Sequence, residues 1–337
     1  MFYPVERKSL LEGYTLTNSA VNRFTTQLTP DGTGWMKLIL NFHATLDWTN
    51  AAVVDRRGLY RYLKGITLRT SRGETIYDNV CGQALYITNC LFNHVAPRHE
   101  VILGADATYD GVLELYLWMP FLNRGEDVIL DTSRYSGLEL SITTGSVLDF
   151  VNDADGESIS VTMDIEVEKT LSALSPDGKS KPVAHAYFAQ RGPFVHSAQG
   201  YFDIESSVDL GLFGFALKIA ATGVTCPFDG AGVDNLTYLT MEDSVRPWVN
   251  RGLPWGLKQE LDNSLHFEAQ NIYLATPATT EQVVYPLLGV YPYWFVKNGS
   301  INEHYATGKK SQIRVTWGDD TATDIGNLVY WGMRALR

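Results

Sequence analysis

The chain has 337 residues, 45% of them hydrophobic and 19% charged, which is enough apolar material for two ordinary cores and excludes a mainly disordered protein. Lys and Arg number 27 against 38 Asp and Glu, and the net charge of −11 disfavours direct binding to nucleic acid, because a surface that coats phosphates must be basic. The three cysteines, Cys81, Cys90 and Cys226, are too few for a disulfide scaffold, so we expect a protein made in a reducing cytoplasm.

The N-terminal segment, residues 1–14, is predicted to form an arm. Its apolar side chains flank Arg7 and Lys8, so it could pack on its own or a neighbouring subunit or lie on a lipid surface. It lacks the apolar core of a secretion signal, and no stretch of the chain approaches the roughly 18 apolar residues that a membrane-spanning helix requires. We therefore expect no export signal and at most contact with a membrane surface.

Most of the chain alternates apolar and polar residues with a period of two, which is typical of strands that have one face on a core and one in water. The clearest case is Ile159–Glu168, where every second side chain is apolar. The same alternation predicts strands at residues 38–48, 66–70, 112–119, 138–143, 265–270 and 313–317. Turn sequences such as Pro30-Asp31-Gly32, Arg72-Gly73, Asp110-Gly111 and Asn298-Gly299 are expected to separate the strands. Frequent turns and alternating strands predict packed antiparallel sheets.

Helices are expected to be few and short. Asn50 can cap a helix over Asn50–Leu63, and a second short helix is predicted at Pro254–Leu261.

Two halves of the chain have a similar outline. Ile66–Ile76 and Leu236–Val245 both have the pattern strand, turn, strand, and Leu138–Gly145 and Ile313–Gly318 both end a strand at a glycine, about half a chain apart. The boundary is placed between Leu171 and Pro182, in a segment rich in turn residues. We therefore predict an all-β protein with a few short helices, built from two tandem jelly-roll β-sandwiches at residues 15–171 and 172–337.

Possible metal ligands occur at three places. Cys81, Cys90, His94 and His99 could supply thiolate and imidazole to zinc, but the spacing is not a recurring zinc motif, and Cys90 is expected to be half-buried on a strand. The acidic segments Asn152–Glu157 and Asp319–Asp324 lack the ligand order of a calcium loop, so an exposed turn is expected, although bound calcium is left open. The prediction is that no residue binds a metal or a cofactor.

The sequence also offers no strong catalytic motif. Gly308–Ser311 lacks the upstream glycine of a phosphate loop. Carboxylate pairs for glycoside hydrolysis could be drawn from Asp203, Glu205, Glu260 and Glu268, but the pairing depends on a distance across a cleft. The aromatic residues of Tyr285–Phe295 and of Tyr330-Trp331 fit a core, a protein interface or a sugar-binding face. No catalytic residue is predicted.

Three strand-rich segments carry a family resemblance: Leu63–Asp78, Leu113–Phe121 and Tyr135–Ile142. They resemble the double jelly-roll major capsid proteins of tailless icosahedral viruses, especially lipid-containing bacteriophages. A looser similarity covers residues 235–318, whereas Leu210–Gly232 departs from the pattern. The resemblance implies a homotrimer of pseudo-sixfold outline that tiles an icosahedral shell, often over an internal membrane.

We therefore interpret the chain as a major capsid subunit of the virion that acts by self-association and is not an enzyme. The expected partners are other copies of itself, neighbouring capsomers, minor capsid or vertex proteins and an internal viral membrane contacted through the arm. The alternatives are a glycan-binding or glycan-cleaving enzyme on tandem jelly rolls and a minor vertex or spike protein.

Overall fold

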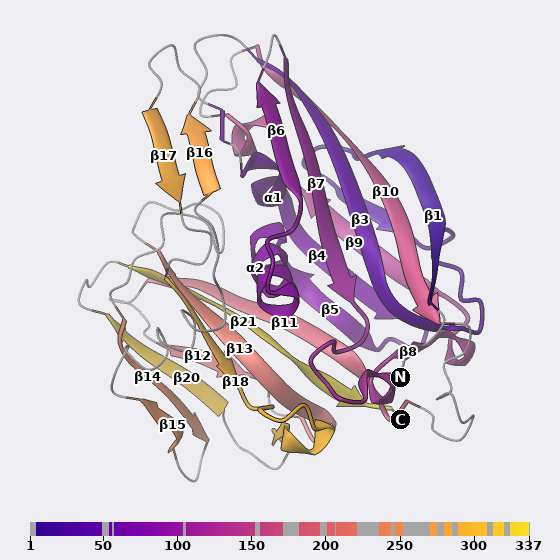
Figure 1. Cartoon of the computed structure of the whole chain (residues 1–337), viewed down its shortest axis with the longest axis vertical. Coiled ribbons are helices and arrows are strands. Elements are labelled where there is room, and N and C mark those ends of the chain that lie inside the picture. Colours follow the sequence, from indigo (N-terminus) through magenta and orange to yellow (C-terminus); the bar gives the residue numbers. More distant parts are fainter. Residues whose placement is uncertain are drawn as a thin grey trace.

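The computed structural model shows two β-sandwiches side by side, with a helix between them (Figure 1). It describes residues 5–48, 54–55, 57–103, 106–151, 156–170, 182–195, 201–205, 207–220, 236–243, 247–251, 270–274, 280–284, 289–308, 313–319 and 324–336.

The first sandwich is formed by the N-terminal half of the chain. Its strands are β1 (Val5–Thr15), β2 (Val21–Phe24), β3 (Gly34–Asp47), β4 (Leu63–Thr70), β5 (Thr75–Val80), β6 (His99–Leu103), β7 (Asp106–Tyr116), β8 (Leu130–Asp131), β9 (Leu138–Thr144) and β10 (Ser158–Thr170). They form one sheet in the order β1-β10-β3-β7-β6, with β8 on β3, and another in the order β5-β4-β9-β2. The two α-helices among the described residues, α1 (Gly58–Tyr62) and α2 (Gly82–Asn93), belong to this half.

The second sandwich repeats this arrangement. Its strands are β11 (Ala184–Val195), β12 (Tyr201–Ile204), β13 (Leu210–Ala220), β14 (Leu236–Asp243), β15 (Pro247–Arg251), β16 (Gln270–Leu274), β17 (Thr280–Val284), β18 (Val290–Trp294), β19 (Tyr305–Ala306), β20 (Ile313–Asp319) and β21 (Ile325–Ala335). One sheet has the order β11-β21-β13-β18, with β19 on β13, and the other has the order β12-β20-β14-β15; β16 and β17 form a separate hairpin.

The strand orders establish two jelly rolls. Each half has eight strands that form its two main sheets, if the short or additional strands β6, β8, β16, β17 and β19 are left out. Numbered along the chain, strands 1, 8, 3 and 6 form one sheet, which is β1-β10-β3-β7 in the first half and β11-β21-β13-β18 in the second. Strands 2, 7, 4 and 5 form the other, which is β2-β9-β4-β5 in the first half and β12-β20-β14-β15 in the second. The predicted double jelly roll is therefore confirmed. The repeat found in the sequence is also explained, because β4 corresponds to β14 and β9 corresponds to β20.

The predicted alternation matches the strands. In β10, side chains alternate between buried and partly exposed from Ile159 onward, and the strand pairs with β3 on one side and β1 on the other. Most of the segment predicted as an arm thus lies in β1, along the edge of the first sheet. The predicted boundary at residues 171–172 falls outside the described residues, between β10 and β11, and stays a prediction.

Two local predictions were wrong or incomplete. Of the helix expected over Asn50–Leu63, the described part is helical only at Gly58–Tyr62. The helix predicted at residues 254–261 and most of the strand predicted at residues 265–270 lie outside the described residues and stay predictions. The expected turn at Asp110-Gly111 is instead the middle of β7. Glycine is needed there because a Cβ on Gly111 would lie 2.5 Å from a methyl group of Leu59.

The largest difference from the sequence-based expectation is α2, a helix that we did not predict. It contains the cysteine that we expected on a strand. Cys90 lies in the helix and is fully buried. Gly82–Phe92 are all buried, so the helix has no polar face, and its Tyr-Ile-Thr run resembles a strand. Neither described helix is long and apolar enough to cross a membrane.

Two hydrophobic cores fill the molecule. The larger core lies inside the first jelly roll and continues through α2 onto one face of the sheet β11-β21-β13-β18. The smaller core lies inside the second jelly roll, on the other face of that same sheet. The described part of the protein is therefore one packed body whose two halves share a core.

Candidate functional site

The described structure contains no cleft with a recognisable catalytic set, so the candidate site is the seam where the two jelly rolls meet. The seam begins with a pair of strands. Strand β5 of the first jelly roll pairs in parallel with β11 of the second, with Tyr77 opposite Phe188. The two rings stack at 4.5 Å with an interplanar angle of 7°, and the backbone N–H of Cys81 donates to the side-chain oxygen of Gln190 at 2.9 Å. This pair joins sheets of both rolls into one nine-stranded sheet.

An aromatic cluster fills the seam behind that sheet. Phe92, near the end of α2, has its ring centroid within 6 Å of five other rings, which are those of Tyr116 and Phe121 from the first roll and Phe188, Trp294 and Trp331 from the second. Such ring pairs add to the gain from burial. Since α2 packs against β4 and β7 of its own roll, Phe92 holds the second roll against the first.

Most of the described aromatic residues that we assigned to a core, an interface or a sugar-binding face lie in these cores. Tyr291, Tyr330 and Trp331 are buried, and Trp294 packs on Phe92. They therefore do not form an exposed sugar-binding face. Tyr285 lies outside the described residues.

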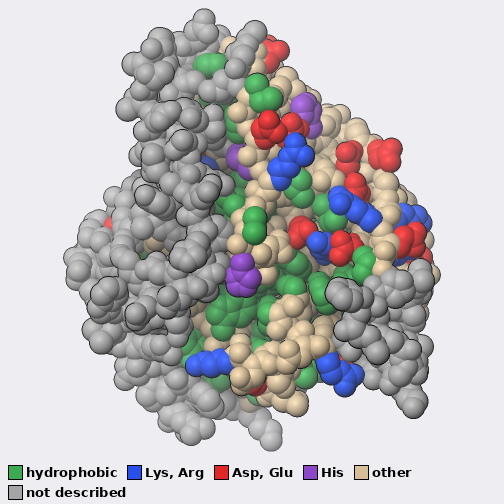
Figure 2. Space-filling model, in the orientation of Figure 1, with side chains coloured by type: hydrophobic (Ala, Val, Ile, Leu, Met, Phe, Trp, Pro, Cys, Tyr) green, Lys and Arg blue, Asp and Glu red, His purple; other side chains and the backbone are tan. Residues whose placement is uncertain are grey.

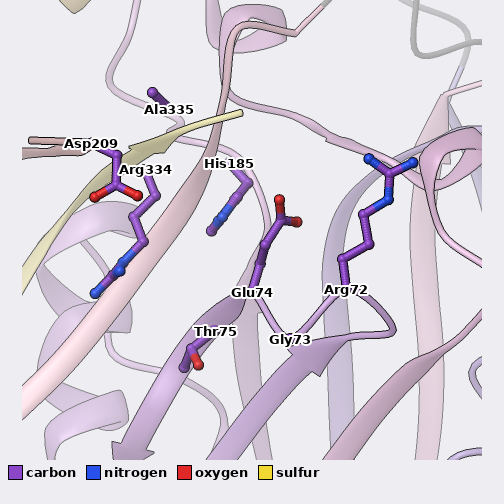
Figure 3. A pocket seen from close by; sticks show the side chains of 8 residues that line it. All are labelled: Arg72, Gly73, Glu74, Thr75, His185, Asp209, Arg334 and Ala335. Atoms are coloured by element: carbon purple, nitrogen blue, oxygen red, sulfur yellow. The ribbon is translucent and has the colours of Figure 1, made fainter. Parts of the chain in front are cut away.

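The seam also has a polar pocket of about 370 Å³ (Figure 3). Its walls come from four separated parts of the chain: the β4–β5 turn, the start of β11, the turn before β13 and the end of β21. The charged or titratable lining residues are Arg72, Glu74, His185, Asp209 and Arg334. Gly73 permits the tight β4–β5 turn with a φ of +79°.

His185 is the buried titratable group of this pocket. Its Nδ1 lies 2.9 Å from the carbonyl oxygen of Ala186, and because a carbonyl only accepts, Nδ1 carries the hydrogen and Nε2 is the basic nitrogen. Burial lowers the pKa of His185, and the positive charge of Arg334 acts in the same direction, while Glu74 and Asp209 oppose it. The imidazole is therefore neutral near pH 7.

The charged groups of the pocket interact with neighbouring side chains. Arg334 donates to the Glu205 carboxylate at 2.7 Å, and its guanidinium carbon lies 4.2 Å from the Tyr187 ring centroid. Thr75 supplies the hydroxyl among the lining side chains. Cations and anions from both rolls meet here, so the pocket is a polar part of the seam.

The structure separates the four residues that were considered as possible zinc ligands. Cys81 precedes α2, Cys90 lies inside it, His94 ends it and His99 lies on β6. Burial raises the pKa of Cys90 to about 12, which keeps its thiol protonated and unsuited to zinc. Among the described residues, no three His, Cys, Asp or Glu side chains are placed to hold a metal ion. Most of Asn152–Glu157 and of Asp319–Asp324 lies outside the described residues.

The carboxylates considered for glycoside hydrolysis are engaged by arginines. Asp203 accepts two hydrogen bonds from Arg314, at 2.9 and 3.3 Å, and Glu205 accepts one from Arg334. Glu260 and Glu268 lie outside the described residues.

One broad surface next to the seam is open to solvent. It is the outer face of the sheet β1-β10-β3-β7, where Figure 2 shows many charged side chains. Cross-strand polar pairs occupy it: the ion pair of Lys37 with Glu114 at 2.6 Å, the hydrogen-bonded pair of His43 with Asp110 at 2.8 Å, and a contact between Arg7 and Glu166.

Comparison with solved structures shows the same fold along the whole chain. The major capsid protein of STIV, Sulfolobus Turreted Icosahedral Virus, matches with a TM-score of 0.69 and 13% identity, over 98% of this chain and 97% of that one. The Faustovirus major capsid protein matches with a TM-score of 0.60 and 7% identity, over 100% and 91%. The major capsid protein of bacteriophage PM2 matches with a TM-score of 0.55 and 10% identity, over 99% and 98%.

No family model matches the chain, and no curated protein matches it at a significant level. The similarity therefore concerns the fold. The resemblance to double jelly-roll major capsid proteins, inferred from the strand-rich segments, is confirmed at that level, and it covers both jelly rolls and the seam between them.

Proposed function

We propose that the protein is the major capsid subunit of a tailless icosahedral virus and that it acts by self-association instead of catalysis. The observation that carries the proposal is the match to the STIV and PM2 capsid proteins over the full length of the chain. Within this chain, the two jelly rolls have the same strand order. In this proposal the subunit is made in the host cytoplasm and resides in the virion shell.

The proposed assembly is a homotrimer. Two similar rolls per chain give six rolls in a three-membered ring, which accounts for a pseudo-hexagonal outline that can tile a closed shell. Stable assembly of this kind needs interfaces of about 2,000 Å² or more. Neighbouring capsomers and minor capsid or vertex proteins are the other proposed protein partners, and the net charge of −11 supports a shell that does not bind the genome directly.

Light scattering coupled to size-exclusion chromatography tests the trimer. The expected mass is three times the chain mass of 37.6 kDa. Electron microscopy of the same fraction should show hexagonal particles. A protein that stays monomeric at every concentration, or a monomer that binds glycans, would contradict the proposal.

The proposed contact with an internal membrane is assigned to the end of the molecule where both termini lie (Figure 1). Val5, Val183 and Val208 are 50%, 58% and 82% exposed. The carbonyl of Val183 accepts from the backbone N–H of Leu336, and that of Asp209, next to Val208, accepts from Ala335, which places both valines beside the C-terminal strand. Exposed apolar side chains beside the C-terminal strand and at the start of β1 favour contact with lipid.

Vesicle flotation tests this contact. The protein is expected to float with phosphatidylglycerol–phosphatidylcholine vesicles, and replacing the three valines with serine should reduce the bound fraction. The same change at Val95 and Ile102, which are 65% and 56% exposed elsewhere, is the matched control. Equal loss in both variants would assign no special role to the terminal end.

A further inference from the structure

The internal seam of the chain uses one particular strand edge from each jelly roll. The first roll contributes β5, the last strand in the order β2-β9-β4-β5, and the second contributes β11, the first strand in the order β11-β21-β13-β18. They pair in parallel at Tyr77–Phe188 and Asp78–Ala189. Each roll therefore offers two edges of this kind, and the chain joins one edge of each.

The two remaining edges are unpaired among the described strands. In the first roll, the counterpart of β11 is β1, which pairs only with β10. In the second roll, the counterpart of β5 is β15, which pairs only with β14. A strand edge presents unpaired N–H and C=O groups, and β1, with 11 residues, is a long edge to leave open.

We propose that β1 of one copy pairs with β15 of the next, in the way that β11 pairs with β5 inside the chain. This inference rests on the proposed self-association and specifies its contact. The two rolls have the same topology, so the movement that places the second roll beside the first, when repeated, brings β1 of a second copy to β15 of the first. The contact joins two different edges and is therefore head to tail, and such contacts close into a ring when the rotation per copy divides a full turn.

The regular part of β1 limits where this pairing occurs. Val5–Ser9 run in unbroken register with β10, whereas the register shifts between Ser9 and Leu11 and again between Leu11 and Tyr14. Gly13, at the second irregularity, has a φ of +62°. Since a bulge interrupts a ladder, we assign the pairing to Val5–Ser9.

The side chains of this segment make the contact between copies different from the internal seam. The internal pair brings together buried Tyr77 and Phe188, whereas Glu6, Arg7 and Lys8 are exposed on β1. The inferred contact is therefore flanked by charges on the side of β1, and its attraction comes from backbone hydrogen bonds between the two strand edges.

Proline variants of the full-length protein test the edge directly. Of two consecutive strand residues, one N–H faces the paired neighbour and the other faces the open edge. Arg7→Pro and Lys8→Pro are therefore made as a pair, and thermal melts identify the variant that keeps the fold. That variant is expected to dissociate into monomers at a protein concentration at least tenfold higher than the wild type does.

The matched control is another open edge of the first roll, β6, through Glu100→Pro and Val101→Pro. The folded member of this pair is expected to remain trimeric. Hydrogen exchange provides a readout without mutation: amides of Val5–Ser9 and of residues 248–251 should exchange more slowly in the trimer than in monomer obtained by dilution.

The outcomes separate the two proposals. A trimer that is unaffected by the folded β1 variant, or that protects β6 instead of Val5–Ser9, overturns the inferred contact while self-association stands. A wild-type chain that never forms trimers contradicts the proposed function itself. If neither β1 variant folds, the exchange measurement on the wild type decides, because it requires no substitution.

Discussion

The sheet β1-β10-β3-β7 and its counterpart β11-β21-β13-β18 have the same strand order but different surroundings. The first has one face on the core and the other in water, where ion pairs such as Lys37–Glu114 lie. The second has a core on each face, because α2 and the first roll cover the side that is exposed in its counterpart.

The amino-acid patterns record this difference. In β10 buried and partly exposed residues alternate, whereas residues 325–332 of its counterpart β21 are all buried, as are all 11 residues of β13. The same jelly-roll position thus tolerates alternation or a continuous apolar run, depending on what covers the sheet. This explains why Leu210–Ala220, the described part of the segment Leu210–Gly232, departed from the pattern expected of a capsid jelly roll, since a comparison of strand alternation cannot recognise a strand with no solvent-exposed face.

A lysine placed on the corresponding faces gives the largest expected difference. Val329 in β21 is fully buried on the side of α2, so Val329→Lys should cost more than about 4 kcal/mol of unfolding free energy or prevent folding. Thr162→Lys on the outer face of β10 should cost less than about 1 kcal/mol. Urea unfolding measures both, and similar values would show that the second sheet is not covered.

Removing the ring that joins the rolls should have the next largest effect. Phe92→Ala deletes contacts with five aromatic rings and should cost about 3–5 kcal/mol. Val95→Ala, just beyond the helix at a side chain that is 65% exposed, is the control and should be nearly neutral. A loss below about 1 kcal/mol for Phe92→Ala would mean that the seam does not depend on this cluster.

A smaller effect is expected at an ion pair of the exposed sheet. Asp31 accepts hydrogen bonds from Lys169 at 2.5 Å and from the Trp35 indole at 3.1 Å. Burial alone would raise the pKa of Asp31, but the hydrogen bonds from Lys169, Thr33 and Trp35 outweigh it and hold the pKa well below the ordinary value of 3.8.

Asp31→Asn should therefore reduce stability near pH 7 by about 1–3 kcal/mol, because it leaves the buried Lys169 ammonium with a weaker partner. The ionised carboxylate stabilises the folded state above pH 3.8, and this contribution is lost as the pH falls toward the lowered pKa. The difference in the free energy of unfolding between the wild type and Asp31→Asn should thus become smaller below about pH 4. A gap that does not change with pH would contradict the assigned interaction.

The smallest expected effect concerns His185 in the seam pocket. Burial lowers the pKa of His185 below the ordinary value of 6.5, so below pH 6.5 the unfolded chain binds a proton that the folded protein excludes. The free energy of unfolding should therefore decrease as the pH is lowered below 6.5, by at most about 1.4 kcal/mol per pH unit. His185→Asn should remove that slope in melts recorded between pH 5 and 7, and an unchanged slope would place its origin elsewhere.

The sequence by itself determined the local architecture, because a period of two is sufficient to define the two faces of a strand. The alternation at Ile159–Glu168 and the repeated strand outlines at Ile66–Ile76 and Leu236–Val245 predicted tandem jelly rolls, and the strand orders confirm them. The absence of a recognisable catalytic motif likewise led us to expect a structural protein.

Only the tertiary structure decided how the two rolls meet. The pairing of β5 with β11, the helix α2 and the pocket around His185 bring together segments that are about 110 residues apart or more, and no local spacing specifies such contacts. Burial on all sides also removes the periodicity on which secondary-structure prediction depends, which is why Cys90 was assigned to a strand and β13 had no recognisable counterpart. Amphipathic patterns show which face of an element meets water. At the seam, elements such as α2 and β13 have no face in water and so have no such pattern.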